Sequence, residues 1–406
     1  MIPFASSPAL MTWRMLLALA VVFVMLATTG WTAVQRGLGT ADPLKAAAAS
    51  WRKGSIGHRH LPSSRSSPRR LAAFFGSLTA KERSRLADRY PLVIGNLNGA
   101  PVNLRYRANR LSLRQEAAAE RHRAHDADLS PDGRDLAEKT VQQYDSMLEP
   151  GRNFLAFDPS GSGRVAEVFG DLSHARRISV VVPGVDTNTL TFQKTGKWYS
   201  APAGMGSSLY TAERAASPAT STAVIAWADY TAPAGLGMDA VIGTLAKAGA
   251  VRLAALTHAL PGTAPVALFC HSYGSVVCGV AARNLPKRVT DVAVAGSPGM
   301  RVASARGLRT RARVWAMRDT GDWIQDIPYV DVVGLGHGAD PVSPSFGARV
   351  VSAAGAQGHA GYFQPGTASL DNFADIGVGD FDAVACAGDN SVCHGGIHAP
   401  RAARRA

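Results

Sequence analysis

The sequence predicts an α/β fold in which a mostly parallel sheet is flanked by helices and follows an N-terminal helical extension. From residue 152 onward, short β-branched runs alternate with Gly/Pro turns and Ala-rich helical segments. The runs are continuously apolar, as parallel strands covered on both faces require, and their alternation with helices predicts right-handed crossovers in an open sheet. Apolar residues form 46% of the 406-residue chain, enough for a sizeable core, and exclude a wholly disordered protein.

The predicted elements follow in chain order. We expect strands at residues 178–182, 223–227, 266–270, 289–295, 313–317 and 348–352. We expect helices at residues 77–90, 130–148, 238–260 and 275–284, with Ser130 as N-cap and Pro131 in the first turn of the second. The domain boundaries predicted from these are 1–31 (signal peptide or membrane anchor), 32–70 (basic flexible linker), 71–150 (helical N-terminal part), 151–377 (α/β core) and 378–406 (C-terminal tail).

The N-terminal segment predicts export. Residues 15–27 are all apolar and follow Arg14. This run is short for a spanning helix and suits the apolar region of a signal peptide. Basic residues after the run oppose a simple outward orientation. We therefore expect a secreted or membrane-anchored protein and leave cleavage open.

Positive charge is concentrated in one segment. Of the net charge of +13, nearly all arises between residues 51 and 125, where 16 Lys/Arg face 4 Asp/Glu. The cations between residues 52 and 70 are scattered among Ser, Pro and Gly, without zinc spacing or an aromatic stacking pattern. A solvated linker is therefore expected, and no nucleic-acid partner.

The four cysteines divide into two pairs. Cys386 and Cys393 bracket a polar loop that a disulfide could close, and we expect that bridge in an exported chain. Cys270 and Cys278 lie in apolar runs and are expected to pack as small hydrophobes. No Cys-x-x-Cys pair or other ligand cluster occurs, so neither a metal nor a cofactor is expected.

A nucleophile elbow is predicted after the third strand of the core. Residues 270–275 read Cys-His-Ser-Tyr-Gly-Ser and lead directly into a helix. The elbow of α/β-hydrolases is Gly-x-Ser-x-Gly at a strand–helix junction. Gly274 supplies the second glycine, while Cys270 stands at the first position, where small volume is the requirement. The motif makes Ser272 the candidate nucleophile, and a serine that merely caps a helix is the alternative.

The acid and base of a catalytic triad are predicted from chain order, which in this fold is Ser, acid, His. Asp322 follows the strand at 313–317 and precedes apolar residues that anchor its loop; Asp319 is the alternative acid. His359 follows the last predicted strand, whereas the competing His337 precedes it. We therefore expect Ser272, Asp322 and His359 to form the triad.

Backbone N–H groups are expected to bind the oxyanion. One donor is the amide of Tyr273, which follows the nucleophile. The second is expected in the loop after residues 178–182, from Val185 or Gly184, since the glycine lets the backbone turn an amide inward.

Several sequence blocks in one order resemble an actinobacterial-type α/β-hydrolase family catalogued as a domain of unknown function, with a His-Ser-Tyr-Gly-Ser elbow. The blocks are residues 78–83, 95–101, 107–110, 157–159, 170–171, 182–185, 271–275 and 296–299. The family usually has Gly where this chain has Cys270. The resemblance implies an α/β-hydrolase fold and a serine hydrolase site, and it implies no substrate.

The sequence as a whole predicts a serine hydrolase that cleaves an ester or related acyl bond, of the esterase or lipase kind, through an acyl-enzyme. Its partner would be a small-molecule or lipid-like acyl substrate, with the membrane as a further contact through the N-terminal segment. The alternative is a non-catalytic α/β-hydrolase scaffold that binds a lipid, peptide or protein partner.

Overall fold

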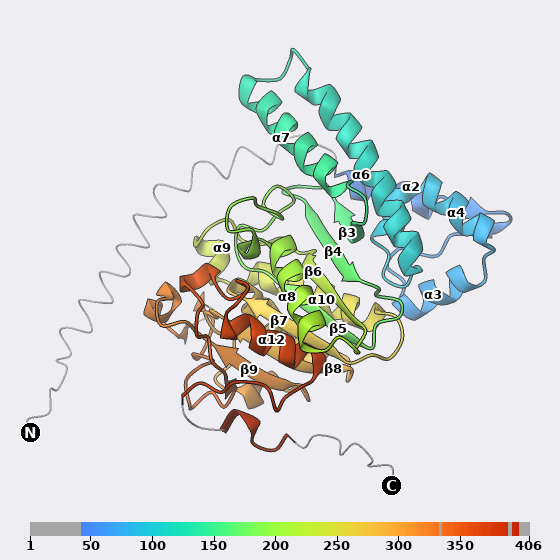
Figure 1. Cartoon of the computed structure of the whole chain (residues 1–406). Coiled ribbons are helices and arrows are strands. Elements are labelled where there is room, and N and C mark those ends of the chain that lie inside the picture. Colours follow the sequence, from blue (N-terminus) through green and yellow to red (C-terminus); the bar gives the residue numbers. More distant parts are fainter. Residues whose placement is uncertain (1–41, 333–334, 389–391, 398–406) are drawn as a thin grey trace, which may run out of the picture.

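The computed structural model describes residues 42–332, 335–388 and 392–397. Its centre is an eight-stranded sheet with the order β12-β9-β8-β7-β5-β6-β4-β3 (Figure 1). The strands are β3 (Asn153–Asp158), β4 (Arg164–Gly170), β5 (Arg177–Val182), β6 (Thr222–Ala228), β7 (Val266–His271), β8 (Val289–Ala295), β9 (Arg313–Met317) and β12 (Arg349–Val350). The six strands from β12 to β6 run parallel, and β4 and β3 extend the sheet in antiparallel fashion.

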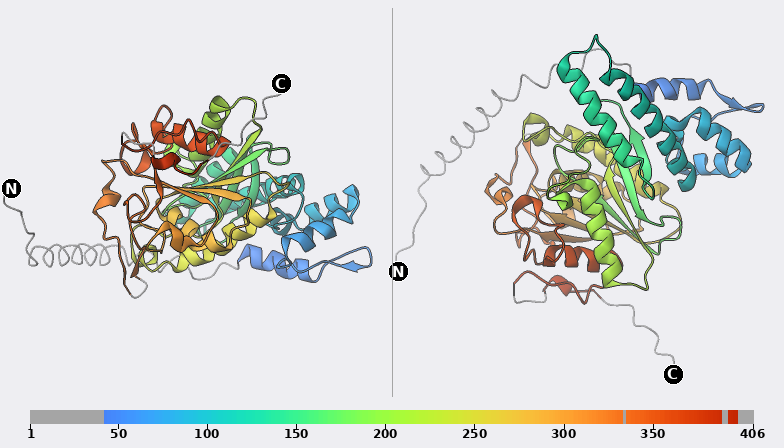
Figure 2. Two further views of the ribbon diagram at one scale, coloured as in Figure 1. Left: turned by 90° about the horizontal axis from the view of Figure 1, so that it is seen from below. Right: turned by 45° about the horizontal axis from the view of Figure 1, so that its top comes forward.

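Helices cover both faces of this sheet (Figure 2). One core cluster joins the sheet to α10 (Thr244–Ala259) and α11 (Tyr273–Ala281). A second cluster joins its other face to α8 (Pro202–Ala216) and α12 (Ala368–Val378). Every residue of β6 and β7 is buried, which explains why these strands read as unbroken apolar runs.

Short elements connect this framework. The helix predicted over 238–260 is divided into α9 (Met238–Val241) and α10, because Gly243 adopts φ 66° between them. The remaining short elements are η2 (Trp198–Ser200), η3 (Ala282–Asn284), η4 (Ala305–Leu308), η5 (Trp323–Asp326), β10 (Asp331–Val332), β11 (Leu335–Gly336), η6 (Gly358–Ala360) and η7 (Val392–His394).

The N-terminal part is helical and has its own apolar cluster. Its elements are α2 (Pro43–Arg52), the hairpin β1 (Ser55–Ile56) and β2 (Arg59–His60), α3 (Pro68–Gly76), α4 (Ala80–Arg89), α5 (Pro91–Gly95), α6 (Val102–Ala124) and α7 (Pro131–Met147). The hydroxyl of Ser130 accepts the N–H of Gly133, so the predicted N-cap is confirmed. In Figure 1 the α6–α7 hairpin projects beyond the sheet.

The prediction of a flexible linker over 32–70 is wrong for the residues that the structure describes. Asp42 caps α2 and also accepts a hydrogen bond from Ser160 at 2.8 Å, in the β3–β4 turn. Trp51, at the end of α2, is fully buried, and its indole N–H donates to the carbonyl of Pro62 at 2.6 Å. The buried Trp51 and the capped helix α2 therefore fix residues that the basic composition had predicted to be a solvated linker.

The segment 1–31, predicted to direct export, lies outside the described residues, as do residues 32–41 of the predicted linker. Over the part of the chain that the structure does describe, no helix combines the length and the apolar character needed to cross a membrane. The eight-stranded, mostly parallel sheet with helices on both faces is the α/β-hydrolase fold that the sequence predicts. The helical N-terminal part precedes this fold, as was also predicted.

Candidate active site

Ser272 occupies the sharp turn between β7 and α11. Its backbone has φ 54° and ψ −128°, a sparsely populated conformation for a residue with a Cβ. Such strain costs on the order of 1–3 kcal/mol and persists where the surroundings hold it. The N–H of Ser272 donates to the carbonyl of Ala295 on the neighbouring strand at 3.0 Å. The turn therefore fixes the serine at the carboxyl edge of the sheet, where such folds place their sites.

Close packing around the elbow explains its second glycine. A Cβ at Gly274 would lie 2.1 Å from the carbonyl oxygen of Val182 on β5. Because that contact is with backbone, no side-chain rotation could relieve it. The predicted requirement for glycine at this position is therefore a steric one.

The first position of the elbow is occupied by a disulfide rather than a free small residue. Cys270, at the penultimate position of β7, is bonded to Cys278 in α11, with a Cα–Cα distance of 6.5 Å. The prediction that these two cysteines pack as separate small hydrophobes is wrong. The elbow reverses the chain and brings the second turn of α11 against the end of β7. The eight-residue separation of the two cysteines in the sequence did not reveal this close approach.

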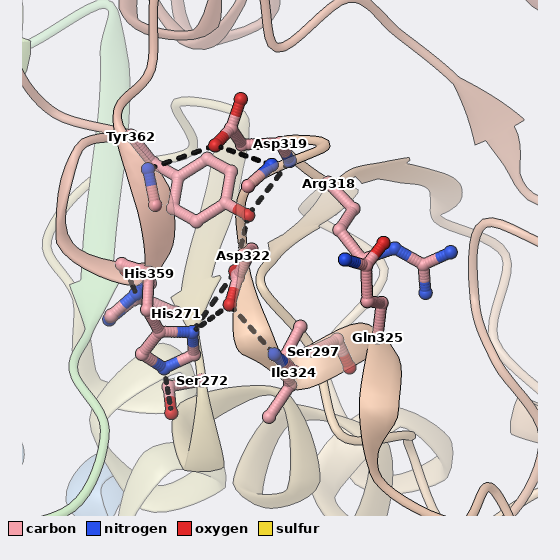
Figure 3. Close-up of polar contacts among 12 residues, drawn as sticks. His271, Ser272, Ser297, Arg318, Asp319, Asp322, Ile324, Gln325, His359 and Tyr362 are labelled. Carbon is pink, nitrogen blue, oxygen red and sulfur yellow. Dashed lines mark hydrogen bonds and ion pairs between the residues drawn. The ribbon is translucent and has the colours of Figure 1, made fainter.

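Ser272, His359 and Asp322 form a continuous hydrogen-bonded chain (Figure 3). His359 Nε2 lies 2.8 Å from Ser272 Oγ, and His359 Nδ1 lies 2.8 and 3.0 Å from the two carboxylate oxygens of Asp322. A carboxylate can only accept, so Nδ1 carries the proton and Nε2 is left to accept from the serine hydroxyl. Asp322 is fully buried, while the His359 side chain is 18% exposed. This is the geometry that a catalytic nucleophile, base and orienting acid would require.

Three donors converge on the buried carboxylate of Asp322. Besides His359, it accepts from Tyr362 Oη at 2.5 Å and from the N–H of Ile324 at 2.9 Å. Burial favours the protonated carboxyl, but the hydrogen bonds from His359, Tyr362 and Ile324 outweigh burial and lower the pKa of Asp322 below its ordinary 3.8. Asp322 is therefore an anion at neutral pH and can stabilise an imidazolium.

The two alternative residues have other partners. Asp319 Oδ2 accepts from the N–H of Gly321 at 3.1 Å and from that of Gly358 at 2.9 Å, so it joins the acid loop to the loop that carries His359. His337 Nε2 lies 2.6 Å from the carbonyl of Ala240, and its ring meets that of Tyr273 edge-on. Neither residue is in the chain of contacts with Ser272.

His271 is a site residue that sequence reasoning missed. Its Nε2 lies 2.7 Å from the carbonyl of His359, so Nε2 donates, and the two rings lie 4.9 Å apart. Burial, and then the neighbouring His359, lower the pKa of His271 to about 3. A neutral His271 thus holds the backbone of His359. Its place beside the nucleophile was visible in sequence, but its contact with His359 was not.

The loop after β5 passes directly beside Ser272. A Cβ at Gly184 would lie 2.7 Å from the Cβ of Ser272, so glycine is required there. Buried Tyr230 places its hydroxyl 2.6 Å from the carbonyl of Pro183 and 3.2 Å from that of Gly184. In a planar trans peptide the N–H points opposite to the carbonyl. The amides of Gly184 and Val185 therefore point away from Tyr230.

Two other features lie apart from this constellation. A cavity of about 810 Å³ lies between α7, β4 and α8, where its lining includes Arg152, Glu167 and Trp198 but no residue of the Ser272–His359–Asp322 chain. Cys386, Cys393 and His394 are close enough to ligate a metal. The two cysteines, however, form the disulfide predicted for them, which leaves no thiolate to act as a ligand.

A family model described as alpha/beta hydrolase matches residues 158–332. The match includes Ser272 and Asp322 and ends before His359. Two curated relatives are similar over most of the chain: uncharacterized proteins MT2140 and Rv2079 of Mycobacterium tuberculosis, from strains CDC 1551 / Oshkosh and ATCC 25618 / H37Rv. Each is 29% identical over 371 residues, which cover 77% of this chain and 56% of the relative. The chain thus spans about half the length of these relatives.

Among solved structures, a predicted CIB-like hydrolase from Thermoplasma acidophilum is similar with 15% identity and a TM-score of 0.35, covering 56% of this chain and 96% of that one. The 2,6-dihydroxy-pseudo-oxynicotine hydrolase is similar with 11% identity and a TM-score of 0.34, covering 84% of this chain and 94% of that one. Neither likeness bears on the reaction.

Proposed function

We propose that this chain is a serine hydrolase that cleaves an ester or related acyl bond through an acyl-enzyme. The observation that carries the proposal is the contact of 2.8 Å between His359 Nε2 and Ser272 Oγ, with the charged carboxylate of Asp322 behind the imidazole. A merely structural serine would not need a base whose tautomer is fixed by a buried anion. The narrower relationship, to the family with a His-Ser-Tyr-Gly-Ser elbow, rests on the sequence blocks that resemble it.

In the first half of the reaction, Ser272 Oγ attacks the carbonyl carbon of the substrate while His359 Nε2 takes the hydroxyl proton. The tetrahedral oxyanion would be held by the amide of Tyr273 and that of Val185 or Gly184. When the intermediate collapses, the bond to the leaving alcohol breaks and His359 gives its proton to the alcohol oxygen. The serine is left esterified.

In the second half, water attacks the acyl-enzyme and His359 accepts its proton. The carboxylic acid leaves as the proton returns to Ser272 Oγ, which restores the starting state. Asp322 stays ionised throughout, in keeping with its lowered pKa. Ester and amide substrates share this tetrahedral intermediate, so a substrate panel is needed to distinguish them.

Labelling with a fluorophosphonate probe tests the proposal, since the probe reacts with activated serines. Wild-type protein should be labelled, and Ser272→Ala should lose both the label and ester hydrolysis. Ser173→Ala, at an exposed turn, is the matched control and should keep both. An unlabelled, folded wild type would instead support the non-catalytic scaffold.

We also infer that the protein is exported, either secreted or anchored in the membrane. The support is the apolar run at residues 15–27 and the pairing of all four cysteines in disulfides. Disulfides of this kind form and persist in oxidising compartments.

A further inference from the structure

Exposed apolar side chains gather in the segments that follow the parallel strands, at the edge of the sheet where Ser272 lies. Within the described residues, the large apolar side chains exposed in segments that follow β5, β6 or β9 are Leu190, Trp198, Leu236, Met238, Trp323, Val330 and Leu335. Trp198 lines the separate cavity between α7, β4 and α8. The other exposed large apolar residues are Leu136 and Val251. In parallel strands the carboxyl ends share one edge of the sheet. Of these residues, Trp323, Leu236 and Met238 lie in segments whose contacts place them beside the candidate active site.

Next to His359, the exposed apolar surface begins with Trp323. The ring of Trp323 lies 4.7 Å from that of His359, and Trp323 remains 41% exposed. Tyr329 Oη is 3.1 Å from the carbonyl of Ile324, which holds the neighbouring Val330 close to η5. An apolar group seated on Trp323 would therefore be beside the catalytic imidazole.

On the oxyanion side the apolar residues are Leu236 and Met238, which are 54% and 45% exposed. The N–H of Gly235, next to Leu236, donates to Asp186 Oδ1 at 2.7 Å, and Asp186 follows Val185 of the oxyanion loop. The N–H of Asp186 donates in turn to the carbonyl of Pro233 at 2.8 Å. These bonds fix the segment that carries Leu236 against the loop beside the nucleophile.

The stretches beside the site carry acidic but no basic side chains, whereas Lys194 and Lys197 lie farther along the β5–α8 segment, at the separate cavity, and Arg306, Arg309 and Arg311 follow β8. Residues 183–193, 229–246 and 319–348 contain no Lys or Arg, although the whole chain has 43. Acidic side chains, among them Asp186, Asp239 and Asp326, are exposed in the same segments. The nearby cations Arg301 and Arg318 bind the carbonyl of Gly336 and the carboxylate of Asp340. An anionic acyl group or head group would meet acidic neighbours here.

We infer that the substrate is an uncharged ester with a long alkyl chain, which lies along Trp323 or along Leu236 and Met238 while its carbonyl reaches Ser272. This inference rests on the proposed hydrolase function. Each methylene fully removed from water strengthens binding by about three- to four-fold. A methylene that lies on an open rim is only partly removed from water, so its effect on binding is smaller. The acyl chain length should therefore control kcat/KM.

The test uses the full-length protein and the p-nitrophenyl esters of acetate, butanoate and octanoate, with the hemisuccinate as a charged partner of the butanoate. We expect kcat/KM to rise at least ten-fold from acetate to octanoate, and the butanoate to exceed the hemisuccinate at least ten-fold. The double variant Leu236→Ser/Met238→Ser, or Trp323→Ala, should lower the octanoate-to-acetate ratio. Val251→Ser, an exposed apolar position on α10, should leave that ratio unchanged.

The outcomes separate the inference from the proposed function. A flat or falling chain-length series, or a preference for the hemisuccinate, in protein that still shows Ser272-dependent labelling would overturn the inference alone. Failure to cleave any of the esters, together with absence of labelling, would overturn the proposed function and the inference with it.

Discussion

The hydroxyl of Tyr362 donates a 2.5 Å hydrogen bond to Asp322 Oδ2, on the side of the carboxylate that also meets His359. The same hydroxyl accepts from the N–H of Asp319 at 3.0 Å. One phenol thus joins the acid, the loop after β9 and the segment just beyond His359. It adds a third donor to a carboxylate that His359 and the N–H of Ile324 already hold.

Tyr362→Phe should lower kcat about ten-fold, since a hydrogen bond to a charged group contributes about 1.5–3 kcal/mol. Without this donor the Asp322 carboxylate keeps only its contacts with His359 and Ile324, and it should hold the imidazole less firmly in line with Ser272. Steady-state kinetics check the loss, and circular dichroism shows whether the variant is folded. An unchanged kcat in a folded variant would contradict a positioning role for Tyr362.

Asp322→Asn should lower kcat by on the order of 10⁴, the loss measured when a triad aspartate is replaced in a serine protease. The amide cannot hold the correct tautomer of His359. Asp319→Asn should cost much less, because its side-chain oxygen can still accept the N–H of Gly358. Steady-state kinetics of the two variants decide which carboxylate is the acid, and a larger loss at Asp319 would reverse the assignment.

His359→Ala should abolish turnover almost as completely as Ser272→Ala, since members of a triad act as a unit. His337→Ala is the matched control at a second buried histidine, and it should retain activity with some loss of stability. Circular dichroism on all three variants would separate lost chemistry from lost fold. Comparable losses of kcat at both histidines would contradict the assignment.

His271 should make stability depend on pH below neutrality. Its folded pKa of about 3 lies below the ordinary 6.5, so between these values the unfolded chain binds more protons. The stability that depends on neutral His271 is therefore complete above pH 6.5 and is lost as the pH falls toward 3. Urea unfolding of His271→Gln, which keeps a donor for the His359 carbonyl, should show a shallower slope there; an unchanged slope would argue against a buried neutral imidazole.

The Cys270–Cys278 disulfide should stabilise the elbow without taking part in chemistry. For so short a loop the chain-entropy model predicts about 2–3 kcal/mol. Cys270→Gly/Cys278→Ala restores the usual glycine and should keep ester hydrolysis while lowering the melting temperature. Mass spectrometry of unreduced peptides should find this bridge and that of Cys386 with Cys393; free thiols in exported protein would contradict both.

The core was predictable because its signals are local. Unbroken apolar runs predicted the positions of the parallel strands to within a few residues. The bounds of β8 and β9 are those predicted. Chain order placed Ser272, Asp322 and His359 after β7, β9 and β12, whose carboxyl ends lie at one edge of the sheet. Antiparallel β3 and β4 and the long helix α6 lack comparably continuous patterns. The last predicted strand shrank to the two residues of β12, since little of it pairs with β9.

What the sequence did not reveal depends on contacts between distant segments. The carbonyl that His271 binds belongs to a residue 88 positions later in the chain. The hydrogen bond from Ser160 to Asp42 joins residues that are 118 positions apart. Composition made residues 52–70 look solvated, although Trp51 anchors the preceding helix against Tyr90, with ring centroids 5.4 Å apart. Pairings of this kind become visible only when the fold has brought the segments together.

The docking of α2 on the body of the protein also limits how far an anchored form could reach. If the apolar run ending at Ala27 is held in a bilayer, only the 15 residues 28–42 separate it from Pro43, the first residue of α2. A chain of that length extends at most about 50 Å. A free segment lasting to residue 70 would have allowed more than twice that distance. An anchored protein would therefore be confined to the layer next to the membrane surface and would meet mainly the esters present there.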